Sequence, residues 1–344
     1  MRTFTLSERF AAKANLLPTA IYDAFPAVLF GRVLVLATRL GVFESLNERR
    51  QSGNELATSL HLHPKGTECI LPPLVAASYL TKHGERYALT PQSKKWLVKS
   101  SPHYIGNFIA YIELLHTHWM TMEDTLRLGK PSQTYAETFT DREWNIYTLG
   151  MMDLAKLIIP YIIPKIRVSS SASRLIDICG SHGLYSIELC TRYPLLTATI
   201  ADFPQVLRTT ESIIEDHHLE KRITLLPCDV LQTQFEKNTY DIALAFNIIH
   251  GFDTNVNKAF LFSAASSLKR GGVLYILDQL KDEHTRGVGN ILPLMVGVNL
   301  LNEIGGNVYT FQEIASWCGE ADLESVKRYH TRLPGVHLVK AVKR

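Results

Sequence analysis

The stretch Arg174-Leu175-Ile176-Asp177-Ile178-Cys179-Gly180-Ser181-His182-Gly183 decides the fold of this chain. It begins as a short β-rich apolar run and ends in a turn of small residues, and the next segment, residues 184–193, has the length of a helix. In an α/β sheet a cofactor sits at such a turn, because small residues let a ligand approach the backbone and the helix N-terminus offers free N–H groups. We therefore expect a ligand-binding turn at the end of a strand.

The chain after this turn alternates between short β-rich runs and amphipathic stretches of helical length. The expected strands are residues 174–179, 197–202, 222–227, 240–246 and 272–277, and the expected helices are residues 184–193, 204–217 and 256–269. Such alternation predicts a parallel, doubly wound sheet. Beyond it we expect a helix and a closing hairpin that turns at Pro334-Gly335, at residues 311–318, 325–333 and 337–342.

The first hundred residues predict a winged-helix pattern. Apolar positions in residues 17–46 recur at spacings near three and four, and two further helix-length segments precede residues 80–90, which are typical of two short strands around a Gly turn. The second of these segments carries few basic side chains, so we expect an interaction module rather than a DNA-binding domain. A winged-helix regulator with a ligand-sensing domain is kept as an alternative.

A linker of small polar residues, residues 168–173, marks the expected domain boundary. We expect a winged-helix domain at residues 1–103, connecting helices rich in aromatic residues and histidine at residues 104–168, and a Rossmann-like domain at residues 169–344. The sequence contains no internal repeat that would suggest another organisation.

Composition indicates a folded cytoplasmic protein with no nucleic-acid, metal or membrane partner. Of 344 residues, 46% are hydrophobic and 20% charged, and the net charge of +3 comes from dispersed residues, which excludes a mainly disordered chain and favours no polyanion. The cysteines, 5 in all, lack CxxC spacing, which argues against disulfides and zinc. The longest apolar stretch, residues 24–37, is interrupted by Pro26, Gly31 and Arg32, so we expect no membrane span.

Ionisable side chains stand at the expected carboxyl ends of the strands. Asp202 ends the second strand, where a carboxylate accepts hydrogen bonds from both ribose hydroxyls of an adenosine moiety, and Asp229 follows the third, where it can accept from an adenine amino group. Each of these two residues could instead be a helix cap. His250 follows the fourth strand and can serve as a general base, and Asp278 ends the fifth and can orient its imidazole.

Taken in order, these motifs resemble those of class I S-adenosylmethionine-dependent methyltransferases, especially the small-molecule O-methyltransferases related to plant caffeate and hydroxyindole enzymes. The resemblance covers nearly the whole chain and rests on residues 177–183, Asp202-Phe203-Pro204, Cys228-Asp229, Asn247-Ile248-Ile249-His250 and Lys269-Arg270-Gly271-Gly272. In the front half, residues 36–44, 55–57 and 87–91 look like the family's winged-helix dimerisation domain. The resemblance implies a seven-stranded Rossmann-like α/β fold and a homodimer.

The resemblance also implies roles for individual residues. His250 would deprotonate an acceptor hydroxyl, which then attacks the sulfonium methyl of S-adenosylmethionine in line. Together with the residue pattern, it gives as candidate catalytic residues His250, Asp278 and Tyr147. Cofactor contacts are expected for Asp177, Cys179, Gly180, Ser181, Gly183, Asp202, Phe203, Asp229, Val230 and Asn247, and acceptor contacts for Trp119, Tyr147, Met151, His250 and Asn299.

Some features depart from the family pattern. The turn is Cys-Gly-Ser-His-Gly, Gly251-Phe252 follows His250 in place of Asp-Trp, and no second carboxylate stands near Asn307-Val308-Tyr309. A different base such as Tyr147, or a sulfur nucleophile that needs no deprotonation by histidine, therefore stays open. The rival functions are S-methylation of a thiol or thioether acid, such as a methylthio-hydroxy acid, and a cofactor-binding protein that has lost methyl transfer.

Overall fold

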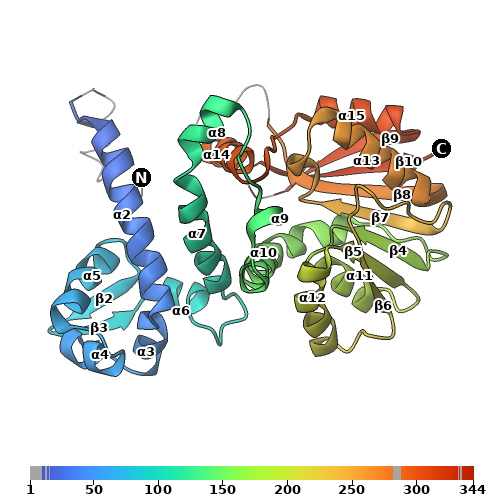
Figure 1. Ribbon diagram of the computed structural model, residues 1–344. Coiled ribbons are helices and arrows are strands. Elements are labelled where there is room, and N and C mark those ends of the chain that lie inside the picture. Colours follow the sequence, from blue (N-terminus) through green and yellow to red (C-terminus); the bar gives the residue numbers. More distant parts are fainter. Residues whose placement is uncertain (1–9, 12–13, 15, 282–287, 332, 334) are drawn as a thin grey trace. The chain divides into compact units, whose positions relative to one another are not determined.

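A computed structural model describes residues 10–11, 14, 16–281, 288–331, 333 and 335–344 (Figure 1). The chain forms two compact units, Met1–Leu115 and His116–Arg344. The division falls inside helix α7 (Gly106–Trp119). The first ten residues of this helix belong to the first unit and its last four to the second. The expected three-part division with boundaries at residues 103 and 168 stays a prediction.

The first unit combines helices with a small antiparallel sheet. Its elements are α2 (Thr19–Arg39), α3 (Val42–Glu48), β1 (Gln51–Ser52), α4 (Gly53–Ser59), α5 (Pro64–Ala76), β2 (Leu80–His83), β3 (Arg86–Leu89) and α6 (Pro91–Trp96). The predicted hairpin is confirmed, because β2 pairs with β3 from Leu80↔Leu89 to His83↔Arg86. Leu71, Leu74 and Tyr87 are fully buried between these helices and the hairpin.

Helix α2 exposes much of its apolar surface. Ile21, Phe25 and Val28 are 60%, 67% and 71% exposed. By length and composition alone, α2 and the segment Asp141–Lys165 could each cross a membrane, a property shared by the core helices of soluble proteins. The prediction that no segment spans a membrane therefore stays a prediction.

The second unit is built on a seven-stranded sheet with the order β6-β5-β4-β7-β8-β10-β9. Its strands are β4 (Arg174–Ile178), β5 (Thr197–Asp202), β6 (Ile223–Pro227), β7 (Tyr240–Phe246), β8 (Leu268–Gln279), β9 (Leu323–His330) and β10 (Val336–Lys343). The pairs among β4 to β8 are parallel, as predicted, and β10 is antiparallel to both β8 and β9. The order reverses at β4, and the ligand crevice of such a sheet lies at the carboxyl ends of the strands there.

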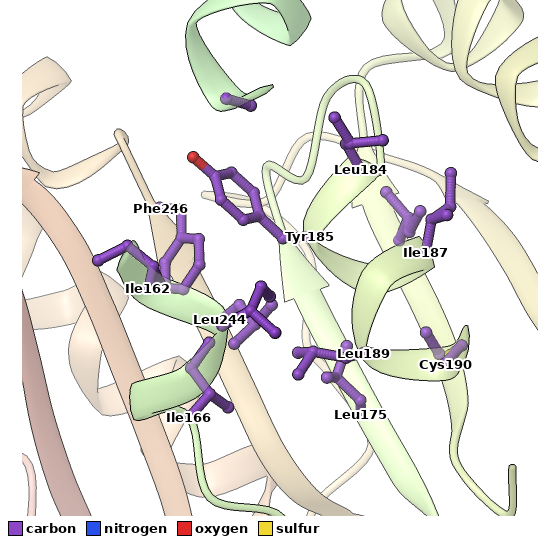
Figure 2. Close-up of a cluster of buried hydrophobic side chains, with 14 of the residues drawn as sticks. Ile162, Ile166, Leu175, Leu184, Tyr185, Ile187, Leu189, Cys190, Leu244 and Phe246 are labelled. Carbon is purple, nitrogen blue, oxygen red and sulfur yellow. The ribbon is translucent and has the colours of Figure 1, made fainter. Parts of the chain in front are cut away.

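Helices cover both faces of this sheet (Figure 1). One face packs against α10 (Asp141–Ile162), α11 (Leu184–Arg192) and α12 (Pro204–Asp216), and the other against α13 (Thr254–Ser267) and α15 (Phe311–Glu320). Figure 2 shows the first core, where Tyr185 of α11 lies against Phe246 of β7 with ring centroids 4.8 Å apart. Because the central strands are buried on both faces, most of their side chains are apolar, which explains the β-rich runs in the sequence.

One boundary and one element after β7 differ from those expected. The helix expected at residues 256–269 ends at Ser267, because Leu268 already pairs with Tyr240 and begins the long strand β8. The segment after β8 contains α14 (Val288–Ile304), which the sequence pattern does not reveal. The closing hairpin is confirmed as β9 and β10, whereas Pro334 lies outside the described residues.

Candidate active site

The turn after β4 takes a backbone conformation that usually requires glycine. The φ angles of Cys179, Ser181 and Gly183 are 58°, 43° and 68°, in the left-handed region. A Cβ on Gly180 would lie 2.6 Å from Cγ of Asp177, so only glycine fits at that position. Cys179 and Ser181 thus adopt a conformation that is strained for residues with a side chain. The glycines of the family pattern adopt it without strain.

His182, inside the same turn, supports the next helix. Its ring is 5% exposed, and Nδ1 accepts a hydrogen bond from the backbone N–H of Leu184 at 3.0 Å. Burial lowers the pKa of His182 to about 3, so the ring is neutral. This histidine therefore accepts the first backbone N–H of α11 and holds the turn in shape.

Asp177 and Asp202 form an acidic cradle beside the turn. Asp177 is 1% exposed and accepts a hydrogen bond from Oγ of Ser186 at 2.7 Å, and Asp202, 7% exposed, accepts from the backbone N–H groups of Ser181 at 2.9 Å and Phe203 at 2.7 Å. Burial raises the pKa of Asp177 to about 7 and that of Asp202 to about 6. A hydrogen-bond donor or a positive charge placed beside either carboxyl group would therefore favour its ionised form.

The other expected cofactor residues follow the neighbouring strands. Asp229, after β6, is half-buried and accepts from the backbone N–H of Leu231 at 3.0 Å and from Nε2 of Gln232 at 2.7 Å, so it also stabilises its own turn. Val230 beside it is buried. Asn247, after β7, has a φ of 52° and donates its backbone N–H to the carbonyl of Leu277. All lie at the same edge of the sheet.

The structure brings His250 and Asp278 together. Nδ1 of His250, in the short helix η2 (Ile249–Gly251), lies 2.6 Å from Oδ1 of Asp278 at the end of β8. Asp278 is 1% exposed and also accepts the backbone N–H of His250 at 3.3 Å. The expected orienting contact is therefore present.

The backbone of His250 is fixed from the other side by the chain that follows α14. Asn307 donates its backbone N–H to the carbonyl oxygen of His250 at 2.8 Å. A Cβ on Gly306 would lie 2.2 Å from that oxygen, so a side chain is excluded there. The position of the imidazole thus depends on where α14 ends.

An aromatic cluster lies beside the cradle. Tyr147 of α10 contacts Tyr135 of α9 (Tyr135–Thr138) and Trp144, with centroid distances of 5.4 and 5.6 Å. Phe139 stacks on Tyr135 at 5.3 Å, and Trp144 also contacts Phe203 next to the cradle at 6.3 Å. Burial, and the negative charges of Glu303 and Asp202, raise the pKa of Tyr147, so its hydroxyl stays protonated and is suited to donate a hydrogen bond.

Trp119 and Asn299, both expected to contact the acceptor, are joined to each other. Nε1 of Trp119 donates to Oδ1 of Asn299 at 2.6 Å, and Nδ2 of Asn299 donates to Oε2 of Glu303 on α14. Met151 is half-buried one helical turn after Tyr147. No group of three or more His, Cys, Asp or Glu side chains that could hold a metal occurs among the described residues.

The sequence pattern misses several residues of the site. Tyr135, Phe139 and Trp144 follow two capping boxes, at Thr134 and Thr140, which mark helix starts but say nothing about a shared cluster. Glu303, 2% exposed, lies in a segment for which the pattern predicts no element. A charged residue in a mainly apolar helix is the signal that could have identified it.

Comparisons with known proteins agree with this geometry. Residues 119–323 match the O-methyltransferase domain, and residues 23–99 match the O-methyltransferase dimerisation domain. Among curated relatives, the 3-hydroxy-5-methyl-1-naphthoate 3-O-methyltransferase of Streptomyces sahachiroi is 24% identical over 94% of both chains. The tetracenomycin polyketide synthesis 8-O-methyl transferase of Streptomyces glaucescens is also 24% identical, over 90% of this chain and 92% of that protein.

Among solved structures, human N-acetylserotonin methyltransferase in complex with SAM aligns with a TM-score of 0.84 at 19% identity, covering 94% of this chain and 97% of the other. This similarity supports the fold of a class I methyltransferase, with a seven-stranded sheet and an N-terminal helical region. The matched domains account for most of both units. The chain therefore belongs to the O-methyltransferase family and is a methyltransferase enzyme.

Proposed function

We propose that this chain transfers the methyl group of S-adenosylmethionine to a hydroxyl of a small aromatic acceptor, with His250 as the general base. The observation that carries the proposal is the 2.6 Å contact between His250 Nδ1 and Asp278, at the same sheet edge as the acidic cradle of Asp177 and Asp202. A base and a binding site for a cationic cofactor thus meet at the reversal point of the sheet.

S-adenosylmethionine is the cofactor, and the residues present fit it. The side-chain atoms Oδ1 of Asp177 and Oγ of Ser181 are buried without a hydrogen-bond partner, and burial of such atoms is costly unless a ligand satisfies them. Asp177 would receive the amino group, Asp202 the ribose hydroxyls and Asp229 the adenine amino group. The bare backbone at Gly180 would leave room for the methionine portion.

The catalytic pair would work through its hydrogen bond. A carboxylate can only accept, so Asp278 holds the proton of His250 on Nδ1 and leaves the lone pair of Nε2 to remove the proton of the acceptor hydroxyl. Bound S-adenosylmethionine supplies an electrophilic methyl group on a sulfonium centre. The protonated hydroxyl of Tyr147 would orient the acceptor rather than deprotonate it.

The aromatic cluster supports an aromatic acceptor. The ring centroids of Tyr135, Phe139, Trp144 and Tyr147 lie 5.3 to 6.4 Å from one another, and this arrangement of faces and edges also suits a planar ligand. The names of the two Streptomyces relatives, a naphthoate and a polyketide O-methyltransferase, point to the same class.

The base is tested by His250→Ala and Asp278→Asn, with His218→Ala on an exposed histidine as the matched control. Calorimetric titration should show unchanged binding of S-adenosylhomocysteine in all variants. Release of S-adenosylhomocysteine with phenolic acceptors should fall by about a hundredfold or more in His250→Ala, less in Asp278→Asn, and not in the control. Full turnover of the phenolic acceptors by His250→Ala would reject the histidine base, and no binding by the wild type would reject the cofactor.

The same family membership supports a cytoplasmic homodimer. The apolar side chains that α2 exposes, Ile21, Phe25 and Val28, lie within or beside residues 23–99, which match the dimerisation domain. A soluble monomer rarely leaves such a surface uncovered. Analytical ultracentrifugation of Phe25→Glu should show a larger monomer fraction than the wild type, and identical sedimentation would contradict this surface.

A further inference from the structure

One face of helix α14 is apolar and exposed. Four of its apolar side chains are 41% to 54% exposed: Ile291, Leu294, Met295 and Val298. Their spacing is i, i+3, i+4 and i+7, so they form one stripe along the helix, which we call the α14 stripe. Helix α8 (Met122–Leu128) packs beside α14, and its Leu126 and Leu128 are also exposed. A soluble monomer rarely leaves so many apolar side chains together at its surface.

The rest of α14 is tied to the proposed active site by contacts. Leu300, on the side opposite the stripe, is buried, and Oδ1 of Asn299 accepts a hydrogen bond from Nε1 of Trp119 at 2.6 Å. Just after the helix ends, Asn307 donates its backbone N–H to the carbonyl oxygen of His250 at 2.8 Å. The segment that carries the base is thus held by the chain that leaves α14, so a partner that covers the stripe also fixes part of the site.

Helix α2 offers a surface of the same kind and length. Its exposed side chains Ile21, Phe25 and Val28 stand at i, i+4 and i+7, and they span about two helical turns, as the α14 stripe does. The charged residue within this stretch, Asp23, stands on the opposite side of the helix from Phe25. Two apolar helix faces of equal length can pack against each other side by side.

The charge pattern and the family comparison favour a second copy of this chain as the partner. Residues 291–298 carry no charged side chain, which is typical of the core of a protein interface. A helix that is apolar on most sides is normally buried in the assembled protein. Residues 23–99 match the O-methyltransferase dimerisation domain, so a second copy brings an exposed apolar helix to the interface.

We propose that α2 of one copy packs against the α14 stripe of the other copy in the homodimer. This inference rests on the proposed homodimer and names the surface that faces α2. The arrangement is reciprocal, so one dimer contains two such helix pairs. In a free monomer the stripe faces water, and the contact that holds His250 loses support. Dissociation should therefore weaken acceptor binding and leave cofactor binding unchanged.

The first test is a pair of opposite charges placed on the two helices. Analytical ultracentrifugation measures the dissociation constant of the dimer for Phe25→Glu, for Leu294→Lys and for the variant with both substitutions. Leu195→Lys, at an exposed leucine in the turn before β5, is the matched control. Thermal melting shows whether each variant is folded.

Each single substitution should raise the dissociation constant by about tenfold or more, because it buries an unpaired charge, and the control should not. With both substitutions the opposite charges meet, so the dissociation constant should lie at least about tenfold below the value that two independent effects predict. A dimer that Leu294→Lys leaves unchanged, or additive effects of the two substitutions, would overturn the inference while the homodimer stands. A monomeric wild type would overturn the homodimer as well, and its binding to phosphatidylcholine vesicles would assign the stripe to a membrane.

The second test asks whether the two helices meet between copies. A tagged copy with Phe25→Cys and an untagged copy with Leu294→Cys are mixed and treated with a short bismaleimide, both with Cys69→Ser because Cys69 is exposed. Peptide mass spectrometry should find residue 25 of one copy linked to residue 294 of the other. Links only between two residues 294, or only within a chain that carries both cysteines, would overturn the inference.

The third measurement connects the interface with the site. Leu294→Lys should raise KM for phenolic acceptors by about tenfold, keep the affinity for S-adenosylhomocysteine within about twofold, and recover when Phe25→Glu is added. An unchanged KM in a monomeric Leu294→Lys variant would overturn the link to the acceptor site. Failure of the wild type to methylate any phenolic acceptor would instead overturn the proposed function, and the ultracentrifugation and cross-linking results would still decide the inference.

Discussion

The cofactor side of the active site is the tight turn after β4 together with carboxylates at the ends of β4 and β5, which backbone N–H groups and a serine hydroxyl hold in place. The acceptor side is made of side chains from α9, α10 and α14. At Gly180 a single added carbon atom would collide with Asp177, and Asp202 is held by backbone N–H groups. On the other side, rings and a carboxylate meet through contacts that another set of side chains could replace. Substitutions on the first side should abolish binding for every acceptor, and those on the second should change which acceptor is used.

Gly180→Ala should have the largest effect. If it were harmless, the difference between the cofactor side and the acceptor side would be contradicted. The added Cβ would lie 2.6 Å from Cγ of Asp177 and 2.8 Å from Cγ2 of Ile200, so we expect S-adenosylhomocysteine affinity to fall by about a hundredfold and stability by about 1–3 kcal/mol. Calorimetry and thermal melting measure both. Gly319→Ala in α15, where nothing lies within 4 Å, is the control and should be neutral or stabilising.

Tyr147→Ala tests the acceptor side in the same way. Loss of the ring contacts with Tyr135 and Trp144 should raise KM for phenolic acceptors by about tenfold. The affinity for S-adenosylhomocysteine should stay within about twofold, because the ring belongs neither to the turn after β4 nor to the cradle of Asp177 and Asp202. Steady-state kinetics and calorimetry separate the two quantities, and an equal loss of both would show that the two sides are not independent.

The cradle predicts a pH dependence that the acceptor side should not share. The pKa of Asp177 is raised to about 7 and that of Asp202 to about 6, from an ordinary value of 3.8, so the folded protein holds protons that the unfolded chain has released. The stability of the ligand-free protein should therefore be greatest near pH 4 with respect to these groups and be lost as the pH rises through 6 and 7, by about 3 kcal/mol for Asp202 alone.

A ligand with an ammonium group reverses this preference, because it favours the ionised carboxylates. Binding of S-adenosylhomocysteine near pH 6 should release protons, and its affinity should rise with pH until about 7. Calorimetry in buffers of different ionisation enthalpy counts the protons. The Asp177→Asn variant should release fewer protons on binding, and the Glu303→Gln variant should release as many as the wild type. Proton release that does not depend on Asp177 would mean that another group titrates on binding.

Cys179→Gly should have the smallest effect. Cys179 holds a φ of 58°, which costs a residue with a side chain about 1 kcal/mol. Glycine removes this cost, but part of the gain is lost because glycine loses more conformational entropy on folding. We expect a gain in stability of at most about 1 kcal/mol with unchanged S-adenosylhomocysteine affinity. A loss of affinity on thermal-shift titration would mean that the thiol itself contacts the ligand.

The contrast between the two sides also explains what the sequence could predict. Parallel strands bring their carboxyl ends to one edge, so Asp177, Asp202, His250 and Asp278 can be grouped from the order of strands and helices along the chain. The starts of the strands are predicted less well where pairing overrides local pattern, as at Leu268, which joins β8 because it pairs with Tyr240.

The acceptor wall could not be predicted in the same way. Tyr135 and Glu303 come from helices that are far apart in the sequence, and no local period indicates that they face the same tyrosine. The departure of the turn from glycine at Cys179 and Ser181 suggests altered geometry, yet both residues adopt positive φ. Small residues can adopt a positive φ at a modest cost in free energy, and the sequence alone does not show where the backbone requires this.

The close approach of Gly306 to the carbonyl of His250 has a consequence for how this enzyme can diversify. The helix that carries Glu303 and the segment that carries the base are joined through a contact with no space for a side chain and through the hydrogen bond from Asn307. New acceptor preferences can arise by exchanging side chains along α14, whereas insertions or deletions between Glu303 and Asn307 would displace the base. Lineages that share this contact are therefore expected to vary in the composition of the helix and to keep the length of its C-terminal turn.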